Sequence, residues 1–230
     1  MARIADRIRS SRLDSMSVDP SAPSVKRRPY DSSRRSEQAA RSRAAVLASA
    51  RALFLRSGVQ DTTVATIAEE SGVSVDTVYK TFGGKAGLLR ALCEQALEGT
   101  GEVPAETRSD LLQAVEHDPR AVLRGLGALT AEVAPRIAPL VLLLPVAGGE
   151  LGALRSDLES ARLARMRLVA SRLAAGGRLR PGLTADAAAD LLWTYSSPEL
   201  FGLLVLGRGW SPDRFGAFVG RSLIAALLPD

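Results

Sequence analysis

The chain has 230 residues, which is enough for a small domain joined to a larger one. Its only cysteine, Cys93, and only histidine, His117, exclude an intrachain disulfide and a Cys/His metal cluster, so we expect no metal and no cofactor. Aromatic residues are few while Ala, Leu and Arg dominate, a balance that favours helix and predicts an all-α fold.

No membrane partner is expected. The longest nearly uninterrupted apolar stretch, residues 137–147, is too short to span a bilayer and contains Pro139 and Pro145. No apolar segment with a small-residue cleavage site follows the first arginines, so a secretory signal is not expected either. We therefore predict a cytoplasmic location.

The net charge of +5 is concentrated at the start of the chain. Residues 1–36 carry nine Lys or Arg against four Asp, whereas the other 194 residues balance 21 positive with 21 negative side chains. The same segment is rich in Ser and Pro and lacks periodic apolar positions, which predicts a disordered basic arm. A basic arm on a neutral body is typical of a chain that meets a polyanion, although many basic tails bind nothing.

Residues 37–98 are predicted to form a compact unit of short helices. The first helix begins near residue 36 and ends at Gly58. Thr63 is placed to cap a short helix that ends at Gly72, and Ser74 to cap the next one. After a Gly-Gly break, another helix begins at Lys85.

Two short helices joined by a Gly-Val-Ser turn are what a helix-turn-helix requires, because the first crosses the second closely while the second enters the major groove. In the second helix, Lys80 and Asp76 are able to read base edges. Val75 fits a thymine-methyl contact and a core position equally well. Tyr79 either contacts DNA or packs against the following helix. For Lys85, a cation near a helix N-terminus, a phosphate partner is the better explanation.

The run from Thr62 to Phe82, followed by Lys85, Leu88 and Leu89, resembles the DNA-binding signature of the TetR family of regulators. The family often has His or Tyr where this chain has Thr81, which removes one longer side chain from the phosphate contacts. Thr63 would cap its helix and touch phosphate, and the resemblance also implies dimerisation through a four-helix contact. It implies that these residues lie at the DNA: Thr63, Ser74, Val75, Asp76, Thr77, Tyr79 and Lys85. Lys80, at a position that varies in the family, is expected to contribute to the operator preference of this chain.

Residues 105–230 form a larger helical region that we expect to bind a ligand and to dimerise. Its apolar content exceeds what one buried helix face needs. A dimer interface and an internal cavity are the two places that could accommodate the additional apolar side chains. Core filling alone is the alternative for any single residue. The predicted interface is Leu200, Leu203, Phe215, Phe218, Val219 and Leu223. The predicted pocket is Leu140, Leu143, Leu144, Met166, Trp193 and Tyr195.

Together these features predict a three-helix helix-turn-helix domain followed by a larger helical domain. The predicted function is a ligand-responsive repressor that binds a palindromic double-stranded DNA operator as a homodimer and responds to an apolar small molecule. No nucleophile-base pair, phosphate loop or metal set indicates an enzyme. The alternative is a helical adaptor or small-molecule sensor without specific DNA binding.

Overall fold

The computed structural model describes residues 32–99 and 103–229, and within these ranges the regular structure is helical, which confirms the all-α prediction. The predicted disordered arm lies outside the described residues except for its last five, residues 32–36, which are helical because α1 begins at Ser32. Among the described residues, no helix has the length and apolar character needed to cross a membrane.

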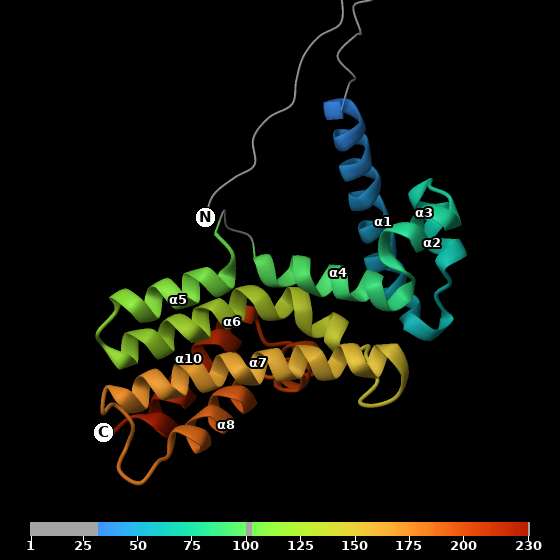
Figure 1. Ribbon diagram of the computed structural model, residues 1–230. Helices are drawn as coiled ribbons and strands as arrows, with labels where there is room; N and C mark the ends of the chain where they lie inside the picture. Colours follow the sequence, from blue (N-terminus) through green and yellow to red (C-terminus); the bar gives the residue numbers. More distant parts are fainter. Residues whose placement is uncertain (1–31, 100–102, 230) are drawn as a thin grey trace, which may run out of the picture.

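An N-terminal unit projects from one end of an elongated helical body (Figure 1). The unit contains α1 (Ser32–Asp61), α2 (Val64–Ser71), α3 (Val75–Phe82) and α4 (Lys85–Glu98), the last of which lies along the body. The body contains α5 (Ala105–Val115), α6 (Pro119–Val141), α7 (Gly149–Ala175), α8 (Ala185–Tyr195), α9 (Pro198–Phe201), the π-helical segment η1 (Gly202–Gly207) and α10 (Pro212–Leu227).

The first regular stretch of α1 breaks at Gly58, as the sequence predicted. The φ of 79° and ψ of 165° at this glycine are not helical, and a short second helical segment runs from it to Asp61. The hydroxyl of Thr62 donates a 2.7 Å hydrogen bond to the Gly58 carbonyl and so satisfies a backbone group that the kink frees. The kink turns the chain toward the start of α2.

Two hydrophobic clusters make up the core. The first joins buried residues of α1 to α4, among them Phe54, Ile67 and Leu88, with Leu140 and Leu144 from the end of α6 and the loop after it. The second joins α6, α7, α8 and α10. The N-terminal unit therefore has no separate hydrophobic core, because side chains of the body complete the cluster that its own residues begin.

Helices α6 and α10 cross with their backbones in direct contact. A Cβ at Gly127 would lie 2.4 Å from the carbonyl oxygen of Gly216, and a Cβ at Gly216 would lie 2.5 Å from that of Gly127. Both distances are shorter than any real Cβ contact, so only glycine fits at this crossing. The crossing brings one face of α10 deep into the body.

This packing corrects half of the predicted dimer interface. Phe215, Val219 and Leu223 are fully buried in the second cluster of a single chain, where they cannot meet a second copy. The apolar periodicity of α10 identified a buried face, but that face packs against α6 of the same chain. Leu203 is 67 % exposed, and Leu200 and Phe218 are partly exposed.

Candidate DNA-binding helix and ligand cavity

The caps predicted for α2 and α3 are confirmed. Thr63 and Ser74 each accept a 3.1 Å hydrogen bond from the backbone N–H three residues later. Between the two helices, Gly72 adopts the left-handed conformation, with φ 69°. These local interactions set the end of α2 and the start of α3, and so place two short helices around one tight turn.

The outer face of α3 is open to solvent. Val75 is 41 % exposed and Tyr79 is 52 % exposed, so the structure excludes the core position for Val75 and full packing of Tyr79 against α4. Asp76 and Lys80, both well exposed, form an ion pair of 2.8 Å one helical turn apart. Such an exposed pair contributes little stability and can open at little cost to meet another partner. Thr77 is exposed on the same helix.

The inner face of α3 fixes its orientation. Val78 is fully buried in the first cluster, and the guanidinium of Arg43 lies 4.8 Å from the ring centroid of the partly buried Phe82. A Cβ at Gly87 would lie 1.7 Å from the Phe82 carbonyl oxygen, so the first turn of α4 approaches the end of α3 closely. Helix α3 is thus held by its buried inner face and at its C-terminal end, while its outer face stays exposed to solvent.

Lys85 has a protein partner that the sequence did not indicate. Its ammonium donates hydrogen bonds of 2.7 Å and 3.4 Å to the carbonyl oxygens of Val59 and Gln60, in the segment of α1 after the kink. The argument for a phosphate rested on a cation without a partner at a helix N-terminus, and these carbonyls supply a partner. A DNA contact of Lys85 remains a prediction. The third proton of the ammonium group would have to donate to the phosphate.

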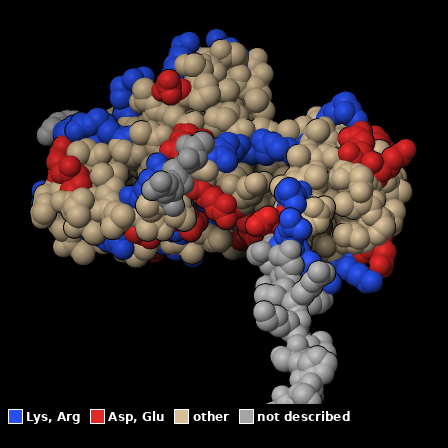
Figure 2. All heavy atoms as spheres, turned by 90° about the horizontal axis from the view of Figure 1, so that it is seen from above, with Lys and Arg blue, Asp and Glu red and all other residues tan. Residues whose placement is uncertain are grey.

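Charges of both signs are interspersed on the face of the molecule seen from above, with uncharged surface between them (Figure 2). Exposed charges of the described residues pair with one another, for example Arg90 with Asp157 at 2.9 Å and Arg56 with Glu70 at 3.2 Å. This face presents no continuous basic field. The excess positive charge lies in the sequence before residue 37.

A cavity of about 190 Å³ lies among α5, α6 and α7, with Leu97 of α4 also in its wall. Most of the lining is apolar, for example Leu129, Val133, Ile137 and Met166. The polar lining consists of Ser109, Thr130, Ser196 and two pairs of charged side chains.

Of the six residues predicted to form the pocket, only Met166 lines this cavity. Leu140, Leu143 and Leu144 pack with the first cluster, and Trp193 and Tyr195 with the second. Helix α6 is apolar on several sides, so its periodicity could not say which side faces the cavity. The residues that sequence reasoning missed lie about a turn away along the same helix, such as Ile137 and Val141.

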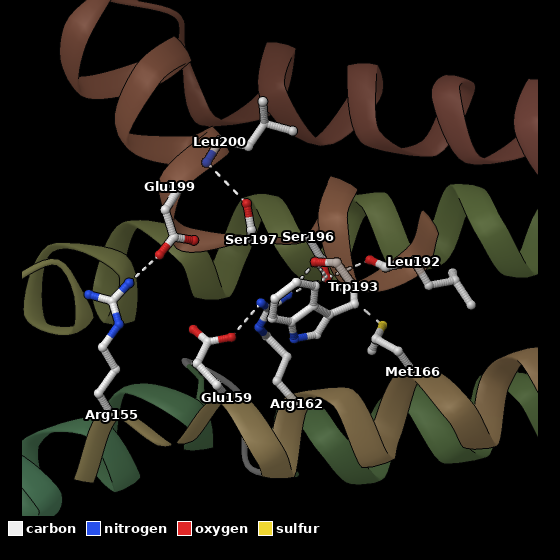
Figure 3. Close-up of polar contacts among 10 residues, drawn as sticks. All are labelled: Arg155, Glu159, Arg162, Met166, Leu192, Trp193, Ser196, Ser197, Glu199 and Leu200. Atoms are coloured by element: carbon white, nitrogen blue, oxygen red, sulfur yellow. Dashed lines mark hydrogen bonds and ion pairs between the residues drawn. The ribbon is translucent and has the colours of Figure 1, made fainter. Parts of the chain in front are cut away.

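The charged groups of the cavity are paired within the chain. Arg162 donates a 2.7 Å bond to Glu159, and Arg165 lies 2.8 Å from Glu106. Arg162 also donates to the Trp193 carbonyl, and its guanidinium lies 4.6 Å from the centroid of that indole ring (Figure 3). Among the described residues, Arg162 Nε and Trp193 Nε1 are buried donors without a partner.

Helix α5 covers the cavity chiefly through polar links. Arg108 forms two hydrogen bonds with Glu132 of α6, at 2.9 Å and 2.6 Å, and Arg165 of α7 reaches Asp110 at 3.4 Å. The bond with Glu132 raises the pKa of Arg108. No residue of α5 belongs to either hydrophobic cluster in the described part of the chain.

Comparison with known proteins agrees with this geometry. Residues 46–92 match the family model for bacterial regulatory proteins of the tetR family. The uncharacterized HTH-type transcriptional regulator YvkB of Bacillus subtilis (strain 168) is 33% identical over 72 residues, which are 31% of this chain and 38% of that protein. The match thus spans little more than a third of this curated relative.

Two solved structures share the fold over most of the chain. Native NalD, the secondary repressor of the MexAB-OprM multidrug efflux pump in Pseudomonas aeruginosa, has a TM-score of 0.68 at 23% identity, with 84% of this chain and 98% of NalD covered. The complex of SmeT with triclosan has a TM-score of 0.66 at 22% identity, with 82% and 92% covered. SmeT is the repressor of the Stenotrophomonas maltophilia multidrug efflux pump SmeDEF.

The fold and the capped pair α2 and α3 define a helix-turn-helix protein with a helical body. The match with the family model lies on the helix-turn-helix unit, residues 46–92, and there the chain is similar to regulators of the TetR family. The resemblance seen in the run from Thr62 to Phe82 is thereby confirmed.

Proposed function

We propose that this chain is a sequence-specific transcriptional repressor that binds a palindromic DNA operator as a homodimer and releases it when a small molecule enters the body. The observation that carries the proposal is α3, a short helix with a buried inner face and an open outer face that presents Val75, Asp76, Tyr79 and Lys80. Such a helix fits the major groove. The proposal places the chain in the cytoplasm, with the chromosome.

A dimer is proposed because one α3 reads only a few base pairs. A two-fold partner would place the second reading helix about 34 Å away, one turn of DNA further on. The exposed side of η1 and α10, with Leu203 and the partly exposed Phe218, is the surface we assign to that contact. A two-fold interface of this kind is self-complementary.

Ligand response is supported by the cavity and by the helices that border it. Leu97 of α4 and Ile137 of α6 line the cavity, and Ile137 also packs against the first cluster, which carries α3. A ligand that shifts these helices changes the position of α3. SmeT, with the same fold, is known in complex with triclosan.

The test is selection of the purified full chain against random duplex DNA, followed by titration of the enriched site at two salt concentrations. We expect enrichment of a palindrome, with affinity that falls steeply as salt rises. Tyr79→Ala and Val75→Ala should each weaken binding about tenfold or more, in line with about 1–3 kcal/mol for a specific contact.

Val115→Ala is the matched control, because Val115 is an exposed valine on α5, far along the chain from the reading helix. It should bind the selected site as the unaltered chain does. Failure to enrich any site would overturn the proposal. The adaptor or sensor without specific DNA binding would then be the better description.

A further inference from the structure

We propose that the ion pair of Asp76 and Lys80 on α3 reads a single G·C base pair as one unit, with Lys80 at the guanine and Asp76 at the cytosine. This inference deepens the proposed operator binding and rests on it. Three observations carry it: the exposure of the pair, the distance between its two charged atoms, and the charge balance of the helix.

The pair is exposed on the part of α3 that a reading helix presents to base edges. The side chains of Lys80 and Asp76 are 76 % and 70 % exposed, and Asp76 lies in the first turn of α3, directly after the Ser74 cap and Val75. Residues near the N-terminus of a recognition helix are the ones that contact base edges. Val78, between the two in the sequence, is fully buried, so both charged side chains point outward.

The separation of the two charged atoms matches the major-groove edge of one base pair. Lys80 Nζ lies 2.8 Å from Asp76 Oδ2, which sets a donor beside an acceptor. A G·C pair presents guanine O6, an acceptor, beside cytosine N4, a donor, and the N–H···O hydrogen bond between these two atoms is about 2.9 Å long. The ion pair and the base edge are therefore complementary at nearly equal spacing.

Neither side chain has to leave its partner to make these contacts. The ammonium of Lys80 donates to Asp76 and keeps further N–H groups, and the carboxylate of Asp76 keeps further lone pairs. The ammonium can donate to guanine O6 and N7 while the carboxylate accepts from cytosine N4. The four groups then form one closed ring of hydrogen bonds.

The charge balance of α3 favours specificity over affinity. Asp76 and Lys80 are the two charged residues of this helix, so α3 brings no net charge to the phosphates. A carboxylate alone would be repelled by the phosphate backbone, whereas beside an ammonium it enters the groove as part of a neutral unit. The pair therefore contributes mainly to the choice of base.

An A·T pair is a poorer match for this unit. Thymine O4 beside adenine N6 also places an acceptor next to a donor. However, the thymine methyl group lies next to O4, on the side where guanine offers N7 as a second acceptor. The ammonium of Lys80 would lose one contact there, so we expect G·C in a single orientation.

The test is selection of the full chain and its variants against random duplex DNA, with base frequencies compared position by position. In the unaltered chain, one position of each half-site should favour G·C by about tenfold, within the range for a specific base contact. Lys80→Gln and Asp76→Ala should each relax this same position and leave the others unchanged. The double variant should relax it no further, because both side chains act on one base pair.

A charge exchange gives a result that loss of binding cannot imitate. Asp76→Lys combined with Lys80→Asp keeps the pair and reverses its direction, so the preferred base pair should change from G·C to C·G at the same position, by about tenfold. Arg56→Gln is the matched control. It removes an exposed 3.2 Å pair with Glu70 in the same N-terminal unit, and every base frequency should stay unchanged.

Relaxation of two different positions by the single variants would mean that Asp76 and Lys80 read separate bases, and relaxation of an A·T position would mean a different base pair. Either result would overturn the inference. So would a palindrome that neither variant alters, and a smaller salt dependence for Lys80→Gln would then assign Lys80 to a phosphate.

These outcomes separate the inference from the proposed function. In each of them the unaltered chain selects a palindrome, so the repressor proposal stands while the reading unit fails. If the unaltered chain selects no site, both proposals fail together.

Discussion

The ammonium of Lys85 donates a 2.7 Å hydrogen bond to the carbonyl oxygen of Val59, across 26 residues of chain. It ties the start of α4 to the segment of α1 beyond the kink at Gly58. Because α2 and α3 lie between these two points in the sequence, the bond closes the helix-turn-helix into a loop. Lys85 therefore acts on the shape of the unit, whether or not it also meets DNA.

Lys85→Gln should lower the free energy of unfolding by about 1–2 kcal/mol, as expected for loss of a hydrogen bond from a charged donor. Lys80→Gln is the matched control, and it should change stability by less than about 0.5 kcal/mol because its pair with Asp76 is exposed. Urea unfolding measures both. A Lys85→Gln chain as stable as the unaltered one, but weaker on DNA, would show that the phosphate contact is its main role.

The loop after α6 should matter to the N-terminal unit as much as to the body. Leu144 is buried in the first cluster, so Leu144→Ala should cost about 2–4 kcal/mol. Leu142, two residues earlier, is 36 % exposed, and Leu142→Ala should cost less than about 1 kcal/mol. Thermal unfolding followed by circular dichroism compares the two. Similar losses from both would contradict the shared core.

The crossing of α6 and α10 should tolerate no side chain. Gly216→Ala places a Cβ 2.5 Å from the Gly127 carbonyl oxygen, so the helices must move apart, at a cost of about 1–3 kcal/mol. Gly207→Ala is the control, since its nearest contact would be an ordinary 3.4 Å. Chemical denaturation should show the first variant destabilised and the second close to the unaltered chain. A stable Gly216→Ala chain would mean that the crossing is looser than described.

Burial raises the pKa of the Cys93 thiol to about 11, with a smaller contribution from Glu94. At pH 8 the folded chain should react with a thiol reagent at least about 100-fold more slowly than the urea-unfolded chain, because a shift of about two pKa units lowers the thiolate fraction that much. Rapid labelling of the folded chain would contradict the buried position.

The same raised pKa of Cys93 makes the free energy of unfolding depend on pH over a defined range. The neutral thiol is favoured in the folded state, so this contribution is complete below the ordinary thiol pKa and is lost as pH rises through about 11. Cys93→Ala should remove it. The difference in unfolding free energy between the two chains should therefore shrink on the alkaline side, and an unchanged difference would argue against it.

What the sequence could predict was local. The caps Thr63 and Ser74 and the glycine turn between them depend on hydrogen bonds over three residues, so their residue types alone indicate them. The exposed face of α3 could be predicted for the same reason, because it depends on the spacing of residues within one short helix. The break at Gly58 likewise followed from a single glycine, whereas the partner of Lys85 did not, because that contact joins residues 26 positions apart in the chain.

Five of the six residues predicted for the pocket do not line this cavity, and three of the six predicted for the interface are buried in one chain, for a related reason. Periodicity shows that one face of a helix is apolar, but not which neighbour covers it. Phe215 and Val219 face α6 of the same chain because Gly127 and Gly216 let α10 approach so closely. Ion pairs around the cavity, such as Arg162 with Glu159, could not be predicted from apolar periodicity, because their side chains are charged.

Ile137 belongs at once to the wall of the cavity and to the packing around the N-terminal core. A side chain shared in this way offers a route for coupling, and any such coupling is reciprocal: if a ligand lowers DNA affinity by some factor, DNA must lower ligand affinity by the same factor. If the repressor proposal holds, an operator-bound copy would thus be a poorer sensor than a free one. The concentration of ligand needed for release would then depend on how many operators the cell contains.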